Sequence, residues 1–143
     1  MDTPPSLSNF TTAARQAFSF LERFGFREVA APAHRSGDRF QIWFGAADRF
    51  VVVAGEGYGT VASVKLEHDG RELSEIYLVP VHERPLTGTR RKHPASQLEQ
   101  LHEAARRLER YGTDFLAGDL SRFIELAKPL PPYKRPPVEG GAD

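Results

Sequence analysis

Apolar residues recur every three or four positions near the start of the chain, and this spacing predicts an N-terminal helix over residues 8–24. Its apolar face consists of Phe10, Ala14, Ala17, Phe18, Leu21 and Phe24. Gly25 follows directly, at the position where helices commonly end on a left-handed residue, a conformation that glycine adopts without strain. Residues 1–7 contain two prolines, so we expect them to form a flexible arm ahead of the helix.

Residues 26–81 alternate between apolar and polar side chains with a period of two, which predicts β-strands. The expected strands cover residues 39–44, 49–54, 60–68 and 72–81, with a further candidate at 27–35. Pro32 would restrict that further strand to an edge of the sheet or interrupt it. Asp69 and Gly70 stand between two alternating runs, which is typical of a tight hairpin turn. Because the loops are too short for crossover helices, we expect a mainly antiparallel sheet of four to five strands.

A second helical pattern is the clearest in the chain and covers residues 96–111. Its apolar stripe consists of Leu98, Leu101, Ala105, Leu108 and Tyr111. Ser96 and Glu99 match a capping box at its start, and Gly112 ends it. Residues 113–118 follow as a short link or helical turn.

The end of the chain predicts one more helix and then a tail. Asp119 is placed to cap a short helix that stops at Pro129. Its apolar residues are Leu120, Phe123, Ile124 and Ala127. Residues 129–143 are rich in proline, and we expect an extended, disordered tail there. The order of one helix, an antiparallel sheet and two helices predicts an α+β fold over residues 8–128, with the two C-terminal helices packed on the sheet.

Three glycines in the stretch "VVVAGEGYGTV" (51–61) raise the question of a phosphate-binding loop. A dinucleotide loop has the spacing Gly-x-Gly-x-x-Gly, but here Thr60 holds the last place and Gly59 comes one residue early. The residues that follow alternate as a strand and do not start the helix that would bind a pyrophosphate. We therefore expect a glycine-rich connection between two strands, with Tyr58 near its tip as a candidate contact residue.

Composition limits the classes of function. The chain of 143 residues contains no cysteine, which excludes disulfides and cysteine-based zinc sites. It carries 19 basic and 19 acidic residues, so its net charge points to neither nucleic acid nor an anionic membrane. No apolar run reaches the ~20 residues of a membrane span, and the N-terminus lacks the pattern of a secretory leader. We therefore expect a cytoplasmic protein that does not associate with membranes.

No residue pattern predicts a metal, a cofactor or catalysis. The five histidines lack the spacing of metal-binding pairs on a helix, and no serine lies in a Gly-x-Ser-x-Gly nucleophile motif. We therefore expect a protein without enzymatic activity. An enzyme stays open as a third option, and it would require a deep pocket that holds His82 or His102 beside a carboxylate.

The uneven distribution of charge supplies two candidate binding sets. Residues 48–83 carry an excess of acids, and residues 84–110 carry an excess of bases. The acidic set flanks the predicted hairpin turn and consists of Glu67, Asp69, Glu72 and Glu75. The basic set precedes the long helix and consists of Arg84, Arg90, Arg91 and Lys92. Arg106, Arg107 and Arg110 of the helix are candidates to extend it. An acidic face would suit a basic protein partner, whereas a basic loop would suit nucleic-acid phosphates or an acidic partner.

Trp43 points to the strand face opposite to its apolar neighbours in the same run. An exposed tryptophan there would be a candidate anchor of an interface, whereas a covered one would indicate that both faces of the sheet are packed. We favour cover by a helix or by the tail, because tryptophan is a large apolar surface to leave in water.

Two stretches of the chain resemble small bacterial α+β proteins, namely "LHEAARRLERYGTDFLAGDLSRF" (101–123) and "FSFLERFGF" (18–26). Some of those proteins are similar to immunity proteins of bacterial toxin systems. The residues of the first stretch that carry the resemblance are packing and capping positions without a catalytic role: Tyr111, Phe115, Leu116, Gly118 and Asp119. The resemblance implies a protein that binds and occludes a partner such as a toxin.

The leading hypothesis from the sequence is a non-enzymatic protein-binding module that occludes a toxin or another partner. Its expected contacts are the acidic set together with Trp43 and Tyr58. The alternative is a nucleic-acid- or phosphate-binding module that uses residues 84–93. The two differ in an observable way, because binding to nucleic acid weakens steeply as salt rises.

Overall fold

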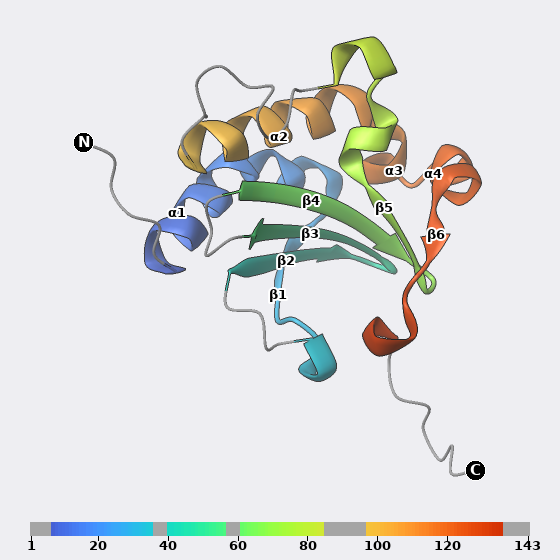
Figure 1. Ribbon diagram of the computed structural model, residues 1–143, viewed down its shortest axis with the longest axis horizontal. Coiled ribbons are helices and arrows are strands. Elements are labelled where there is room, and N and C mark those ends of the chain that lie inside the picture. Colours follow the sequence, from blue (N-terminus) through green and yellow to red (C-terminus); the bar gives the residue numbers. More distant parts are fainter. Residues whose placement is uncertain (1–6, 36–39, 57–60, 85–96, 136–143) are drawn as a thin grey trace.

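The computed structural model describes residues 7–35, 40–56, 61–84 and 97–135. Within them the chain forms an α+β fold, as predicted (Figure 1). The N-terminal helix α1 spans Leu7–Ala17 and is followed by the 3₁₀ helix η1, Ser19–Phe24. Phe18, Leu21 and Phe24 are three positions apart, which matches the three residues per turn of a 3₁₀ helix. Gly25 ends it in the predicted left-handed conformation, with φ of 84°.

The sheet has six antiparallel strands in the order β1-β2-β3-β4-β5-β6. They span Arg27–Val29 (β1), Gln41–Ala46 (β2), Arg49–Glu56 (β3), Val61–His68 (β4), Arg71–Ser74 (β5) and Lys128–Pro129 (β6). The count exceeds the four to five predicted because β6 has only two residues, too few to leave an alternating pattern. Asp69 and Gly70 form the predicted tight turn, since both have positive φ, at 50° and 73°.

The strand predicted over residues 72–81 is wrong beyond Ser74. The chain there forms two 3₁₀ helices, η3 at Glu75–Leu78 and η4 at Val81–Glu83. The pairing of β5 with β4 stops at Ser74, and η3 then packs against the long helix α2, Gln97–Tyr111. Glu75 and Leu78 are three residues apart and both become buried, so one turn of 3₁₀ helix replaces further alternation.

Within the described residues, three α-helices lie between β5 and β6 in the chain: α2 at Gln97–Tyr111, α3 at Thr113–Ala117 and α4 at Ser121–Leu126. In Figure 1, α1 and α2 lie side by side over one face of the sheet, and both contact it. The core between these layers contains the largest fully buried side chains: Phe10, Phe18, Phe26, Phe115, Phe123, Leu21, Leu66, Leu101, Leu108, Leu116, Val51 and Val53. The N-cap of α4 is Leu120 and not the predicted Asp119, although the Asp119 carboxylate accepts a hydrogen bond from the backbone N–H of Ser121, the first residue of the helix, at 3.1 Å.

The opposite face of the sheet is covered as well, by η2 at Ala33–Arg35 and η6 at Pro132–Lys134, which lie below the sheet in Figure 1. Trp43 is buried there, with only 2% of its surface exposed. Its Nε1 donates a hydrogen bond to Oε1 of Gln41 at 3.1 Å, and the Arg35 guanidinium lies 4.7 Å from the centre of its ring. The prediction that a helix or the tail covers Trp43 is therefore confirmed, because η2 covers part of its ring.

The C-terminal residues correct the expectation of a disordered tail from residue 129. Residues 128–135, which we call the C-terminal strap, begin as the edge strand β6 and continue to η6 on this second face of the sheet. Leu130 is buried, and its N–H donates to the carbonyl of Gly70 at 2.9 Å. Nε2 of His34 lies 2.9 Å from the carbonyl oxygen of Lys134. Residues 136–143 of the predicted tail and residues 1–6 of the predicted arm lie outside the described residues.

Candidate functional site

The four acids of the predicted acidic face do not share a face of the protein. Glu67 and Glu72 are directly opposite each other on β4 and β5 and point to the second face of the sheet. Glu67 is buried at 5% exposure, and Arg35 donates to both of its carboxylate oxygens at 2.6 Å. Nζ of Lys134 lies 3.7 Å from Oε2 of Glu72.

The other two members of the acidic set lie elsewhere. Asp69 is exposed in the hairpin turn, whereas Glu75 is 3% exposed beneath α2. The prediction that these four acids form one contact surface is therefore wrong. Alternation along the strands carries Glu67 and Glu72 to a covered face, and the chain leaves the sheet before Glu75.

Glu75 instead forms a buried ion pair that joins η3 to α2. Nη2 of Arg107 lies 2.7 Å from Oε1 of Glu75, and Nε of Arg107 donates to the same oxygen at 3.1 Å. Burial raises the pKa of the Glu75 carboxyl above its ordinary value, and the hydrogen bonds from Arg107 oppose that rise. The pair fixes the position of η3, and so of the residues that follow it, relative to α2.

The raised pKa of Glu75 predicts a pH dependence of stability. The folded state holds the Glu75 proton over a pH range in which the unfolded chain, with a pKa near 4.5, has released it. Stability contributed by this group is therefore present at low pH and is lost as pH rises through the raised folded pKa. We expect the free energy of unfolding of the wild type, measured by urea denaturation, to fall relative to that of Glu75→Gln above about pH 4.5. Parallel pH profiles for the two proteins would contradict this.

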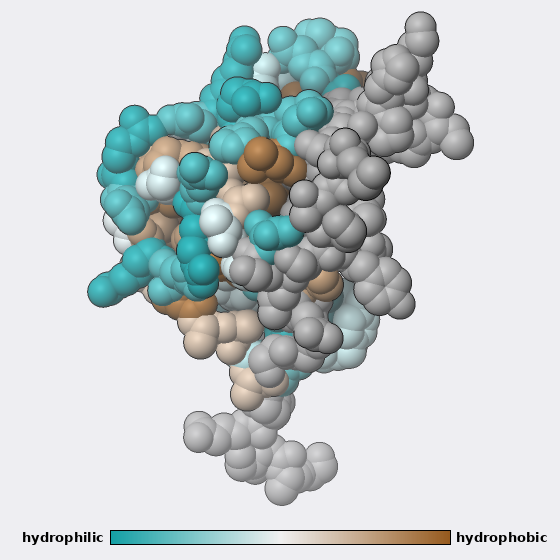
Figure 2. Space-filling view, turned by 90° about the vertical axis from the view of Figure 1, so that its left-hand side faces the viewer, coloured by the Kyte–Doolittle hydropathy of each residue, from teal (hydrophilic) through white to brown (hydrophobic). Residues whose placement is uncertain are grey.

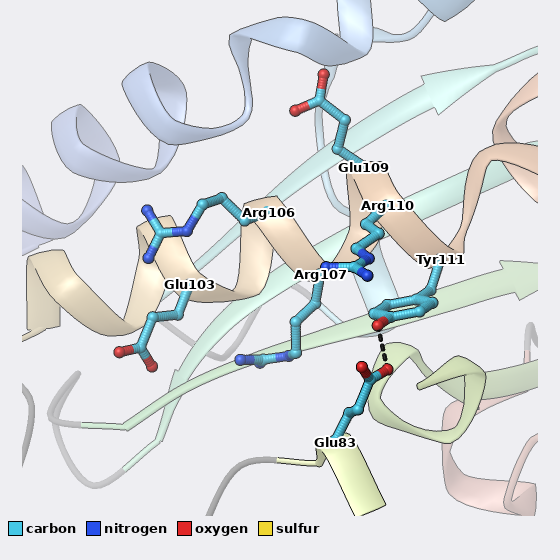
Figure 3. A pocket seen from close by; sticks show the side chains of 7 residues that line it. All are labelled: Glu83, Glu103, Arg106, Arg107, Glu109, Arg110 and Tyr111. Atoms are coloured by element: carbon cyan, nitrogen blue, oxygen red, sulfur yellow. Dashed lines mark hydrogen bonds between the residues drawn. The ribbon is translucent and has the colours of Figure 1, made fainter. Parts of the chain in front are cut away.

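An open groove of about 630 Å³ runs along the outer side of α2 (Figure 3). Its lining residues are Glu83, Glu103, Arg106, Arg107, Glu109, Arg110 and Tyr111. Most come from α2, where spacings of three and four residues bring side chains onto one face of a helix. Glu83 comes from η4 and closes the groove from below in the view of Figure 3.

Several charged groups of the groove are already engaged within the protein. The hydroxyl of Tyr111 donates to the carboxylate of Glu83, and this bond raises the pKa of Tyr111. Glu109 pairs with Arg23 of η1, and Glu103 also has an interaction of its own. Arg107 is engaged by Glu75, as described above.

Two arginines of the groove remain exposed, and neither has an ion pair within the described ranges. These are Arg106 and Arg110, which are four residues apart on α2. The guanidinium of Arg110 lies 5.2 Å from the centre of the Tyr111 ring, which favours one orientation of that side chain. The charged groups of the groove that stay available to a ligand are therefore the guanidinium groups of Arg106 and Arg110.

Exposed apolar side chains also lie on η3 and on η4, the element that supplies Glu83 to the groove. Tyr77 is 53% exposed and Val81 is 74% exposed. Nε of Arg84 donates to the carbonyl of Val79 at 3.0 Å, and its guanidinium lies 5.3 Å from the centre of the Tyr77 ring. We call Tyr77, Val81 and Arg84, together with the lining of the groove, the α2–η4 surface.

The remaining candidates from the sequence are not part of this surface. Tyr58, Arg90, Arg91 and Lys92 lie outside the described residues. Of the basic set only Arg84 is described, and it belongs to the α2–η4 surface. Neither His82 nor His102 lines the groove. The sequence missed the surface because its members come from residues 77–84 and 103–111, two segments that only the packing of η3 on α2 brings together.

On the side of the molecule shown in Figure 2, hydrophilic residues dominate the upper part, and apolar residues lie between them without forming one broad patch. Among the residues that the structure describes, no group of three or more histidine or acidic side chains is arranged to hold a metal ion. Within the same ranges, no helix combines the length and apolar character needed to cross a membrane.

Comparisons with models of protein families, with characterised proteins and with solved structures found no match to this chain. The α2–η4 surface is therefore the basis for a proposed function.

Proposed function

We propose that this chain is a protein-binding domain and that the α2–η4 surface is its contact site. The observation that carries the proposal is the combination of exposed Tyr77 and Val81 with a groove lined by arginines. Tyrosine and arginine are enriched among the few residues that carry most of the binding energy at protein interfaces, because each combines a large contact area with hydrogen-bond donors. The surface is also held in place, since the buried Glu75–Arg107 pair fixes η3 on α2.

The same groove argues for a protein partner over nucleic acid. Glu83, Glu103 and Glu109 line it together with its three arginines, so a continuous polyanion would meet repulsion as well as attraction. A nucleic-acid site would favour an uninterrupted positive surface that neutralises several phosphates. A protein segment with charges of both signs suits this groove better. The predicted role as an immunity-like protein that occludes a toxin stays a prediction.

A site-specific crosslinking experiment tests the proposal. The photoreactive residue p-benzoylphenylalanine is placed at Val81, in the α2–η4 surface, or at Asp69, in the exposed hairpin turn of the acidic set. Each tagged variant is expressed in the cells from which the chain derives, irradiated and purified under denaturing conditions. We expect one protein adduct from the Val81 variant that unlabelled wild-type protein competes away, and no such adduct from the Asp69 variant.

Three other outcomes would each count against the proposal. An adduct from the Asp69 position alone would move the site to the hairpin. A Val81 adduct that nuclease treatment removes, and that forms less as salt rises, would favour nucleic acid. No adduct from either position would leave protein binding by either surface without support.

A further inference from the structure

We infer that Arg106 and Arg110 form a two-point carboxylate-binding subsite, and that the partner segment seated in the groove carries two acidic side chains one helical turn apart. This deepens the proposed function and rests on it. The inference names the chemistry that the partner must supply at one part of the α2–η4 surface.

The charges of the groove single out these two arginines. Arg107 is committed to the buried Glu75 carboxylate, and its side chain has only 20% of its surface exposed. Glu83 and Glu109 are bound by Tyr111 and Arg23, respectively. Arg106 and Arg110 are exposed and form no ion pair with any residue that the structure describes. Each guanidinium presents five N–H donors in a fixed plane, a geometry that fits a carboxylate with two parallel hydrogen bonds.

The spacing of the two arginines sets the spacing of the ligand. Residues four apart on a helix have their Cβ atoms about 5–6 Å apart. Figure 3 shows the two side chains leaving α2 in different directions, so both guanidinium groups must turn toward the ligand to meet two carboxylates at this separation. Acidic residues four apart on a partner helix have this separation. The Tyr111 ring holds Arg110 from one side, and the bond from Tyr111 to Glu83 holds that ring.

The acids of the groove limit the ligand to a short acidic segment. Glu103 and Glu109 also line the groove, and in Figure 3 Glu103 points to the lower side of α2 and Glu109 to its upper side. A longer run of negative charge would meet these carboxylates, and like charges at an interface oppose binding. The groove therefore favours two acidic side chains within an otherwise neutral or mixed-charge segment.

Peptide titration followed by NMR of the arginine side chains tests the inference. The probe is a synthetic helical peptide with glutamates at positions i and i+4, and the matched probe has glutamine at both positions. We expect the Nε–Hε signals of Arg106 and Arg110 to shift with the first peptide, and we expect about tenfold weaker binding of the second. The double variant Arg106→Gln, Arg110→Gln should lose the same factor. The control Arg71→Gln, an exposed arginine of β5, should bind as the wild type does.

Equal affinity for the two peptides would overturn the inference, and so would unchanged binding by the double variant. Tighter binding of inorganic phosphate or of a single-stranded oligonucleotide to the same arginines would overturn it in favour of phosphate recognition. Crosslinking from Val81 separates this failure from that of the proposed function. If the double variant keeps its Val81 adduct, only the carboxylate subsite fails, whereas a wild type without any adduct removes the proposed function itself.

Discussion

Replacing Arg107 by Met is expected to lower the free energy of unfolding by about 3–5 kcal/mol at neutral pH. The reason is that Glu75, with 4% of its side chain exposed, would stay buried beneath α2 without its counter-ion. The loss should become smaller as pH falls, because a protonated Glu75 no longer needs a positive partner and burial already raises its pKa. Urea denaturation at several pH values, followed by circular dichroism, measures both effects.

Two further variants separate the buried charge from the loss of side-chain packing. Arg23→Met removes one partner of the exposed Arg23–Glu109 pair and should cost about 0–1 kcal/mol. The double variant Arg107→Met, Glu75→Leu should recover most of the stability, because two apolar groups of similar size can replace a buried ion pair. If Arg107→Met costs no more than Arg23→Met, the Glu75–Arg107 pair does not stabilise the fold as described.

The fold was predictable where local signals decide the structure. Asp69 and Gly70 adopt the positive φ angles that their residue types favour, and Gly25 ends its helix as expected. The long amphipathic pattern at residues 96–111 corresponds to α2. Each of these features depends on residues close together in the sequence, so no knowledge of distant contacts was needed.

The candidate site was not predictable because its determinants are distant in sequence. Glu67 is buried by Arg35 and Glu75 by Arg107, and each pair is separated by 32 residues. An acid beside a hairpin turn is usually solvated, so nothing in the local pattern distinguishes these two glutamates from Asp69. The alternating run after Ser74 similarly matched a strand, and only the packing of η3 on α2 explains why it is not one.

The order of the C-terminal strap was also not predictable, because it depends on contacts with residues distant in sequence. A segment rich in proline has the composition of a disordered tail. In the structure, however, Leu130 is buried and Lys134 forms an ion pair with Glu72. Both faces of the sheet are therefore closed, one by helices and one by η2 and the strap. The strap and η2 lie on the second face, whereas the groove with exposed arginines lies on the outer side of α2.

Replacing Arg35 by Met should also cost about 3–5 kcal/mol, because the Glu67 carboxylate would lose a partner that donates to both of its oxygens. The side chains of this pair are only 12% and 7% exposed, so water replaces the lost hydrogen bonds poorly. A second consequence is local to Trp43, whose ring contacts the Arg35 guanidinium and which is the single tryptophan of the chain. We expect its fluorescence emission under native conditions to move to longer wavelength as water reaches the indole.

The matched control is Arg15→Met, which removes one partner of the exposed Arg15–Glu28 pair between α1 and β1. That change should cost about 0–1 kcal/mol and leave the emission of Trp43 unchanged, because Arg15 is on the helical side of the sheet. Loss of stability in Arg35→Met without any shift in emission would show that Glu67 needs Arg35 but that η2 still covers Trp43. Unchanged stability would contradict the buried pair itself, and the second face would then be held closed by Leu130 and the other apolar contacts of the strap.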